Sequence, residues 1–284
     1  MRRNAAYSFP FILLAFISCT TRGRGISSGQ EKSDRTRYFP KSIHIVEKIP
    51  RKENIWVFFL AGQSNMAGRG FVEPQDTLPA ERVLTITANG QLVLAKEPLH
   101  FYEPTLTGLD CGLSFGKHLI QYLSDSISVL LIPTAVGGSS VSQWLGDSLY
   151  RNVQLLSNFR EKVQIGKKYG PVKAVLWHQG ESDANANDIP HYKERLSALF
   201  KQFRVIVGNE SLPILIGELG SFSKDPENWR LINQAVKNYC ATDSNTVIIS
   251  TADLKDKGDK IHFNSEGQRI LGLRFANAYL QRFK

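Results

Sequence analysis

Residues 55–67 of the chain read IWVFFLAGQSNMA. Residues 55–60 are all apolar, and such an unbroken run is typical of a strand that is buried on both faces of a sheet. Gly62 permits a tight turn after it, and Met66 can sit in the first turn of a helix. The stretch therefore predicts that Ser64 is presented on the loop that leaves a buried strand, at a helix start that would stabilise an oxyanion. A serine that merely caps the helix is the alternative.

Further apolar runs of about the same length predict a sheet of parallel strands, at residues 128–132, 172–177, 214–216 and 247–249. Between and after them, apolar residues recur at helical spacing over residues 113–124, 191–203, 229–239 and 265–283, the last with Ser265 as the expected N-cap. This alternation predicts an α/β fold with a doubly wound sheet, in which ligands bind beyond the carboxyl ends of the strands.

The composition is that of an ordinary globular protein: 284 residues, 42% hydrophobic and 21% charged, with a net charge of +9. Its basic residues are dispersed and do not alternate with aromatic ones, so we expect no nucleic-acid partner. Cys111 and Cys240 lie too far apart to indicate a disulfide framework, and we favour two buried free thiols over a bridge.

The first residues have the layout of a secretory signal: Arg2 and Arg3, an apolar stretch over residues 9–17, and then Cys19. A cysteine at this place resembles a lipoprotein cleavage site. Ordinary cleavage near Ser18, or a retained anchor, is the alternative. We therefore expect an exported, periplasmic or cell-surface lipoprotein that touches a membrane only through Cys19, with a signal peptide at 1–18, a tether and edge segment at 19–50 and a globular domain at 51–284.

Two polar motifs follow predicted strands. Gly137-Gly138 comes after the run at 128–132, and paired glycines bring backbone N–H groups close to a ligand. His178-Gln179-Gly180-Glu181-Ser182-Asp183 comes directly after the run at 172–177, and its Gln179 amide could donate to an oxyanion. A metal site built from His178, Glu181 and Asp183 is a weaker alternative, because no second histidine lies nearby at ligand spacing.

The last motif pairs Asp259 with His262, three residues later. Asp259 can accept a hydrogen bond from one imidazole nitrogen, which leaves the other nitrogen as a base. A charged surface loop is the alternative for the motif as a whole. Asp256 and Asp253 are the rival partners for the histidine.

Taken together, these motifs resemble the sialate O-acetylesterase-like family, which is carbohydrate esterase family 6 within the SGNH hydrolase superfamily. The resemblance rests on Gly62 to Met66, the Gly137-Gly138 turn with Trp144 after it, His178 to Asp183, and Asp259-x-x-His262-Phe263, in the family's order. It implies a flavodoxin-like three-layer α/β/α sandwich with a central parallel sheet, so that residues 51–284 form an SGNH-type esterase domain.

The resemblance also implies roles for single residues. Ser64 would be the nucleophile, His262 the general base and Asp259 its orienting acid. The oxyanion hole would consist of the Ser64 and Gly138 N–H groups and the Gln179 side chain, where wider SGNH enzymes carry asparagine. No metal or other cofactor is implied.

We therefore expect a carbohydrate O-acetylesterase that acts on acetylated sugars such as xylan or sialic acid. A glycan-binding lipoprotein without activity, or a general esterase of small esters, are the alternatives. The sequence does not identify the substrate-binding residues. Four aromatic residues are candidate stacking platforms for a sugar, and a core or partly buried aromatic is the alternative for each: Trp144, Tyr102, Phe101 and Trp229.

Overall fold

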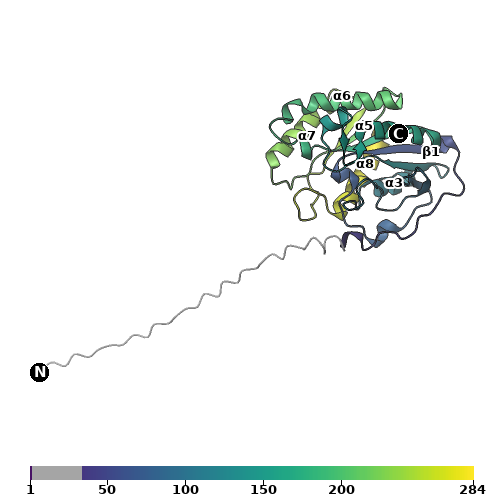
Figure 1. Cartoon of the computed structure of the whole chain (residues 1–284), viewed down its shortest axis with the longest axis horizontal. Coiled ribbons are helices and arrows are strands. Elements are labelled where there is room, and N and C mark those ends of the chain that lie inside the picture. The colour runs from purple at the N-terminus through teal and green to yellow at the C-terminus, as the bar shows by residue number, and fades with distance from the viewer. Residues whose placement is uncertain (2–33) are drawn as a thin grey trace.

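The computed structural model describes Met1 and residues 34–284. Apart from Met1, the predicted signal peptide, Cys19 and the first part of the tether lie outside the described residues. The described part forms a central sheet with helices on both faces (Figure 1). Within it, no helix combines the length and the apolar character that crossing a membrane requires.

The main sheet has seven strands in the order β3-β2-β4-β1-β7-β8-β9. All neighbours pair in parallel except β2 and β3, which are antiparallel. The strands are β1 (Ile55–Gly62), β2 (Val83–Ile86), β3 (Leu92–Leu94), β4 (Ser128–Pro133), β7 (Val172–His178), β8 (Ile214–Gly217) and β9 (Thr246–Ile249), and a separate hairpin joins β5 (Leu149–Tyr150) to β6 (Val153–Gln154). The five predicted strands are thus β1, β4, β7, β8 and β9, and the prediction of a mostly parallel α/β sheet is confirmed.

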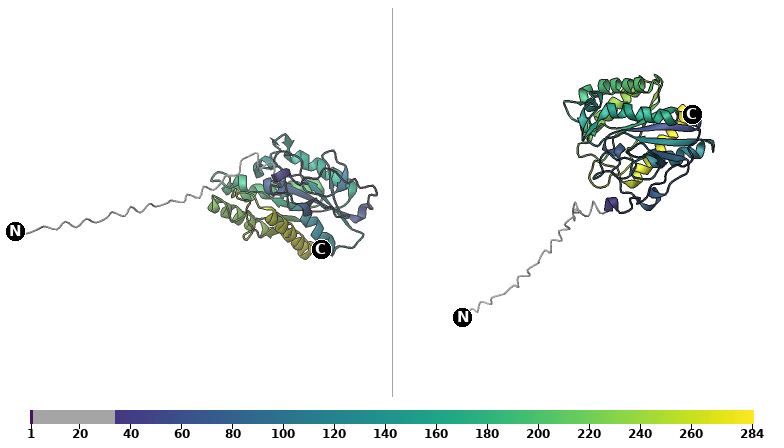
Figure 2. Two further views of the ribbon diagram at one scale, coloured as in Figure 1. Left: turned by 90° about the horizontal axis from the view of Figure 1, so that it is seen from below. Right: turned by 45° about the vertical axis from the view of Figure 1, so that its right-hand side comes forward.

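Helices cover both faces of this sheet, which makes three layers. The α-helices are α2 (Ser64–Ala67), α3 (Gly112–Leu119), α4 (Val141–Leu145), α5 (Leu155–Tyr169), α6 (Ile189–Val207), α7 (Pro226–Cys240) and α8 (Ser265–Phe283). Short 3₁₀ helices are η1 (Lys52–Asn54), η2 (Pro74–Thr77), η3 (Ile120–Tyr122) and η4 (Glu181–Asp183). In Figures 1 and 2, α5 and α6 lie on one side of the sheet and α3 and α8 on the other.

The side chains of β1 show how one strand serves two cores. Val57 and Phe59 pack in the cluster that includes residues of α5, α6 and α7. Phe58 and Leu60 pack in the opposite cluster, with residues of α3 and α8. Because successive side chains of a strand point to opposite faces, a strand between two helical layers must be apolar throughout. The continuous run at residues 55–60 follows from this placement.

Several predicted boundaries need correction. The predicted helix at 113–124 ends as an α-helix at Leu119 and continues only as the 3₁₀ turn η3. Ser265 is not the N-cap of α8, because the cap is Asn264, whose side chain accepts a hydrogen bond from the Gly267 N–H. Helix α5 and strands β2 and β3 were not predicted.

The segment that precedes the first strand lies along the edge of the sheet. The isolated bridge of Ile45 to Val93 lays residues 44–46 along the free edge of β3.

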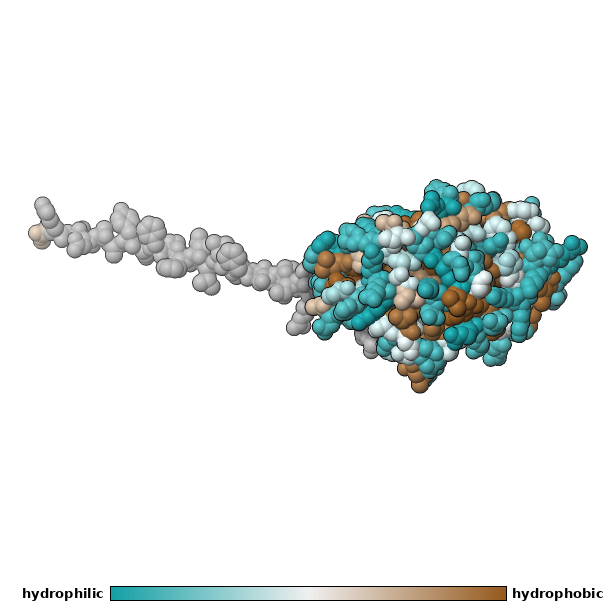
Figure 3. Space-filling view, turned by 90° about the horizontal axis from the view of Figure 1, so that it is seen from above, coloured by the Kyte–Doolittle hydropathy of each residue, from teal (hydrophilic) through white to brown (hydrophobic). Residues whose placement is uncertain are grey.

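Cys111 and Cys240 are both free thiols, the first buried and the second partly buried. The face drawn in Figure 3 is mostly hydrophilic, with apolar side chains in small separate patches, as is usual for a globular surface.

Candidate active site

Ser64 stands where the sequence predicts it, immediately beyond the end of β1. Gly62, the last residue of β1, has a φ of 134°, and a Cβ atom there would lie 2.1 Å from the carbonyl oxygen of His178 on β7. Only glycine fits such a close approach of two backbones with this φ. The chain then turns into α2, of which Ser64 is the first residue.

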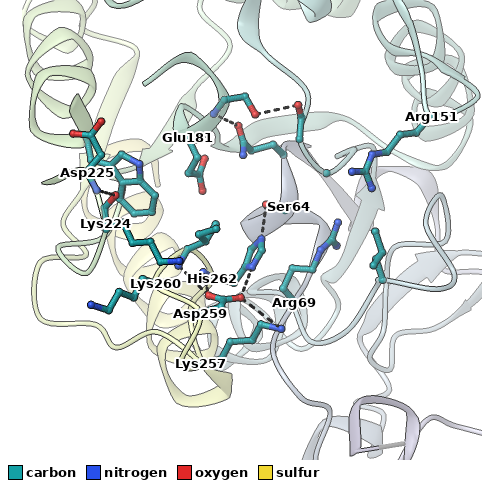
Figure 4. Close-up of a pocket in the computed structure, with 18 of the residues that line it drawn as sticks. Ser64, Arg69, Arg151, Glu181, Lys224, Asp225, Lys257, Asp259, Lys260 and His262 are labelled. Carbon is teal, nitrogen blue, oxygen red and sulfur yellow. Dashed lines mark hydrogen bonds and ion pairs between the residues drawn. The ribbon is translucent and has the colours of Figure 1, made fainter. Parts of the chain in front are cut away.

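The structure brings Ser64, His262 and Asp259 into one hydrogen-bonded chain (Figure 4). His262 Nε2 lies 2.9 Å from Ser64 Oγ, and His262 Nδ1 lies 2.7 Å from Asp259 Oδ2. A carboxylate only accepts hydrogen bonds, so Nδ1 carries the ring proton and the Nε2 lone pair faces the serine hydroxyl. This arrangement is the one that activates a serine for attack.

Asp259 is held as an ionised partner of the histidine. Burial alone would raise its pKa, but hydrogen bonds from the His262 ring and from the His262 and Ile261 N–H groups outweigh burial and lower the pKa of Asp259. The rival carboxylates lie elsewhere. Asp253 is paired with Arg274, and Asp256 accepts the N–H groups of two loop residues.

Asn65 joins the segments that carry these residues, a role that the sequence analysis missed. Its Nδ2 donates to Glu181 Oε1 at 2.6 Å and to the carbonyl of Ile261 at 3.0 Å. Its Oδ1 accepts the N–H of Phe263, and its own carbonyl accepts Gln268 Nε2. Asn65 therefore fixes the distance between the serine and the histidine loop. The only signal for it in the sequence is its place inside the Gly62 to Met66 motif.

The Gly137-Gly138 turn lines the same cavity as Ser64, and a buried ion pair holds the turn in place. Glu103 is buried, accepts the Gly137 N–H at 2.6 Å and pairs with Arg69 at 2.9 Å and also with Arg151. Burial alone would raise the pKa of Glu103, but the charge of Arg69 and its hydrogen bond outweigh burial and lower it. Gly138 has a φ of 80° and lines the cavity, and its N–H has no partner within the described chain. That N–H is available to a ligand.

Gln179 does not point into the cavity, which corrects the prediction that its amide faces the substrate. It is 1% exposed, and its Nε2 donates to Gln63 Oε1 at 3.2 Å, to the Ser139 carbonyl at 3.1 Å and to Asp183 Oδ2. Its Oε1 accepts the Tyr192 hydroxyl. Because the side-chain amide hydrogens of Gln179 are donated to protein acceptors, this side chain holds its neighbours in place and has no donor left for a ligand.

Gln63 is the amide that does line the cavity. Its Oε1 accepts hydrogen bonds from Gln179 Nε2 and from the N–H groups of Gly180 and Ser182. These donors fix the orientation of the amide, and Gln63 Nε2 has no partner in the described part of the chain. A side-chain donor next to Ser64 is thus present, one residue before the serine.

His178, Glu181 and Asp183 are not arranged as a metal site. His178 Nε2 lies 2.9 Å from the carbonyl of Glu218, and Asp183 Oδ2 accepts the Val141 N–H at 3.0 Å. Over Met1 and residues 34–284, no group of three or more histidine, cysteine, aspartate or glutamate side chains could hold a metal ion.

The cavity above Ser64 has a volume of about 840 Å³, and the cationic side chains in its lining outnumber the acidic ones. Among the four candidate platforms, only Trp229 lines it. Trp144 is fully buried in the core, Tyr102 donates to the Pro133 carbonyl and Phe101 lines a separate cavity. The charged lining residues are Arg35, Arg69, Arg151, Lys224, Lys257 and Lys260, against Glu181, Asp225 and Asp259.

A three-layer fold with these motifs in this order defines an SGNH-type hydrolase. The chain belongs to the family described as carbohydrate esterase, sialic acid-specific acetylesterase, whose model matches residues 54–281. The resemblance stated from the motifs is therefore confirmed, and the family is one of acetylesterases that act on carbohydrates.

Individual relatives agree with this assignment. A probable carbohydrate esterase of Arabidopsis thaliana, At4g34215, is 31% identical over an alignment of 280 residues that covers 92% of this chain and 99% of the relative. The X-ray structure of the Arabidopsis protein matches with a TM-score of 0.72 at 29% identity, over 82% of this chain and 100% of that one. Two further structures show the same fold: NanS, with a TM-score of 0.66 at 18% identity over 82% and 98% of the two chains, and XAC1771, a carbohydrate acetylesterase from Xanthomonas citri, with 0.59 at 20% over 81% and 56%.

Proposed function

We propose that this protein is a carbohydrate O-acetylesterase that works through an acyl-enzyme on Ser64. The observation that carries the proposal is the hydrogen-bonded chain from Ser64 through His262 to Asp259 at the floor of the cavity. A nucleophile, a base and an orienting carboxylate in this order are the parts of serine esterase chemistry.

In the first half-reaction, Ser64 Oγ attacks the acetyl carbonyl carbon while His262 Nε2 takes the hydroxyl proton. The charge that develops on the carbonyl oxygen is stabilised by the N–H groups of Ser64 and Gly138 and by Gln63 Nε2. The intermediate collapses, the bond to the sugar oxygen breaks, and His262 returns the proton to that oxygen. Water then attacks the acetyl-serine by the same route, so that acetate leaves and Ser64 regains its proton.

For the substrate, we favour an acetylated sugar that carries a carboxylate. Six cationic side chains against three acidic ones line the cavity, which favours an anionic ligand. Trp229 offers an apolar surface to the ring. The family description, which names sialic acid, supports the same choice.

The test measures acetate release from a panel of acetylated sugars, both neutral and carboxylated, by the wild type and by Ser64→Ala. The variant should lose esterase activity and keep its melting temperature, because only one oxygen atom is removed. A Ser64→Ala protein that keeps a tenth of the wild-type kcat would contradict the mechanism.

The same panel separates the alternatives when sugar binding and the hydrolysis of two p-nitrophenyl esters are measured as well. A binding protein without activity would bind the sugars and release no acetate. A general esterase would hydrolyse p-nitrophenyl butyrate as well as p-nitrophenyl acetate, whereas an acetylesterase should prefer the acetate.

We also propose export and lipid anchoring at Cys19. The support is the signal-like layout of residues 1–19 in the sequence. Labelling with a fatty-acid analogue in a bacterial host tests it, since Cys19→Ala should abolish incorporation and release the protein from membranes.

A further inference from the structure

Glu181 presents an unsatisfied carboxylate oxygen at the active-site cavity. The residue lines the cavity, and Figure 4 shows its carboxylate pointing into the space beside Ser64. The side chain is only 6% exposed. Its Oε1 accepts Asn65 Nδ2 at 2.6 Å, whereas its Oε2 is buried and has no hydrogen-bond partner in the described structure.

The neighbouring histidine does not supply the missing donor. His178 Nδ1 lies 3.8 Å from Glu181 Oε1, which is beyond hydrogen-bond length. His178 Nε2 faces the Glu218 carbonyl, which only accepts, so Nε2 carries the ring proton. Burial lowers the pKa of His178, which keeps the ring neutral and leaves Nδ1 without a hydrogen. Within the described residues, no lysine or arginine forms an ion pair with Glu181.

A buried acceptor without a donor is costly, and the cost is recovered when a ligand supplies the donor. Hydroxyl groups are the donors that a sugar carries in number, and an O–H bond to a carboxylate is among the stronger hydrogen bonds. Glu181 is also hydrogen-bonded to Asn65, the residue that follows the nucleophile, and lines the same cavity as Ser64, so a sugar esterified near Ser64 lies within its reach.

We propose that Glu181 Oε2 is a hydroxyl subsite, which accepts a hydrogen bond from a free hydroxyl of the sugar ring that bears the acetyl group. The inference rests on the proposed function. It makes Glu181 a specificity-determining residue that favours partly acetylated sugars. Esters without a free hydroxyl leave Oε2 unsatisfied, and a site built to bond a hydroxyl discriminates against analogues that lack it.

The experiment compares Glu181→Gln with the wild type on three substrates. These are a mono-O-acetylated sugar chosen from the panel, the same sugar fully O-acetylated, and p-nitrophenyl acetate. The glutamine keeps Oε1 for Asn65 and replaces Oε2 by a group that cannot accept. We expect kcat/KM for the mono-acetylated sugar to fall about 10- to 100-fold, mainly through KM, as for the loss of one hydrogen bond to a charged group. The other two substrates should change by less than about two-fold, since they make no such bond.

Asp225→Asn is the matched control, because it removes one negative charge from the same cavity and asparagine caps α7 as well as aspartate does. It should change the mono-acetylated and the fully acetylated form of the sugar by the same factor, because the two forms carry the same charge. Should Glu181→Gln fail to fold, the wild type can be assayed with deoxy analogues of the mono-acetylated sugar, of which at least one should lose activity by the same 10- to 100-fold.

The outcomes are distinct. Equal losses on all three substrates, or no loss on any, would overturn the subsite while leaving the esterase intact. A wild type that releases no acetate from any of the three would instead overturn the proposed function.

Discussion

Gln63 and Gln179 show how two side chains of one type acquire different tasks. Both are buried amides, and one hydrogen bond joins them. Gln179 has committed its donors to the protein, whereas Gln63 has committed its acceptor and keeps its Nε2 toward the cavity. The motifs place both residues near the site, but the direction of each amide depends on neighbours that are distant in sequence.

Gln63→Glu tests this division of tasks. The variant keeps the acceptor for Gly180 and Ser182 but has no N–H for the oxyanion. We expect kcat to fall about 100- to 1000-fold with little change in KM, as for the loss of one oxyanion donor. The measurement is p-nitrophenyl acetate kinetics together with the melting temperature. If Gln63→Glu stays near the wild-type kcat while Gln179→Glu does not, the earlier prediction for Gln179 is reinstated.

Asp259→Asn should lower kcat about 100- to 1000-fold, because asparagine favours the wrong imidazole tautomer. The loss should be smaller than in a fully buried triad, since the Asp259 side chain is 33% exposed. Asp253→Asn and Asp256→Asn serve as controls and should remain close to the wild type. If either control loses activity and Asp259→Asn does not, the carboxylate is misassigned.

The effect of Asp259→Asn on the stability of the fold should depend on pH. Asp259 has a lowered pKa in the folded protein, so it stabilises the fold above its ordinary pKa of about 4. This stabilisation is lost as the pH falls through the lower pKa of the folded state. The stability difference between the wild type and Asp259→Asn should thus be full at pH 7 and shrink in acid.

At the level of elements, the turn between β4 and α4 depends on a buried ion pair. Removing the Glu103 carboxylate leaves Arg69 buried without a counter-charge and the Gly137 N–H without an acceptor. We expect Glu103→Ala to destabilise the protein by about 3 kcal/mol, measured by urea unfolding. Glu227→Ala, which breaks an exposed pair with Arg230, is the control and should change stability little. Similar losses in both variants would mean that the buried pair has no special role.

The central elements were predictable because burial on both faces leaves no polar positions. This holds for β1, β4 and β8, whereas β7 carries Lys173 and β9, at the other edge of the sheet, is only partly buried. Strands β2 and β3 were missed because they have only four and three residues, too few to show a periodicity; β3 lies at the edge of the sheet, and Thr85 interrupts the apolar run of β2. Helix α5 carried a usable signal, since Leu155, Phe159 and Val163 recur every four residues and are all buried.

The site was predictable to the extent that motifs and strand ends coincide. Ser64, Asp259 and His262 meet as expected from the carboxyl ends of parallel strands. Two supports, Glu103 and Arg69, belong to no motif, because they act through burial and pairing. Their roles emerge only when the loops after β1, β3 and β4 are packed together.

For the whole molecule, the cationic cavity predicts a dependence on salt. If the substrate carries a carboxylate, kcat/KM should fall severalfold between about 20 mM and 500 mM salt, because salt screens the attraction to the lining. A neutral acetylated sugar of similar size should show little change. Equal salt dependence for both substrates would argue against a carboxylated substrate.

The hydrogen bonds of Asn65 also have a consequence for the stage of synthesis at which the site is completed. Asn65 bonds Ile261 and Phe263, which the ribosome adds almost 200 residues later. Until those residues emerge and dock, the nascent chain has a serine without a base. Hydrolytic competence therefore arrives in one late step, when the loop before α8 closes onto the start of the domain. On the proposed mechanism, a partly made chain that has already formed β1 and β4 but lacks this loop cannot cleave esters.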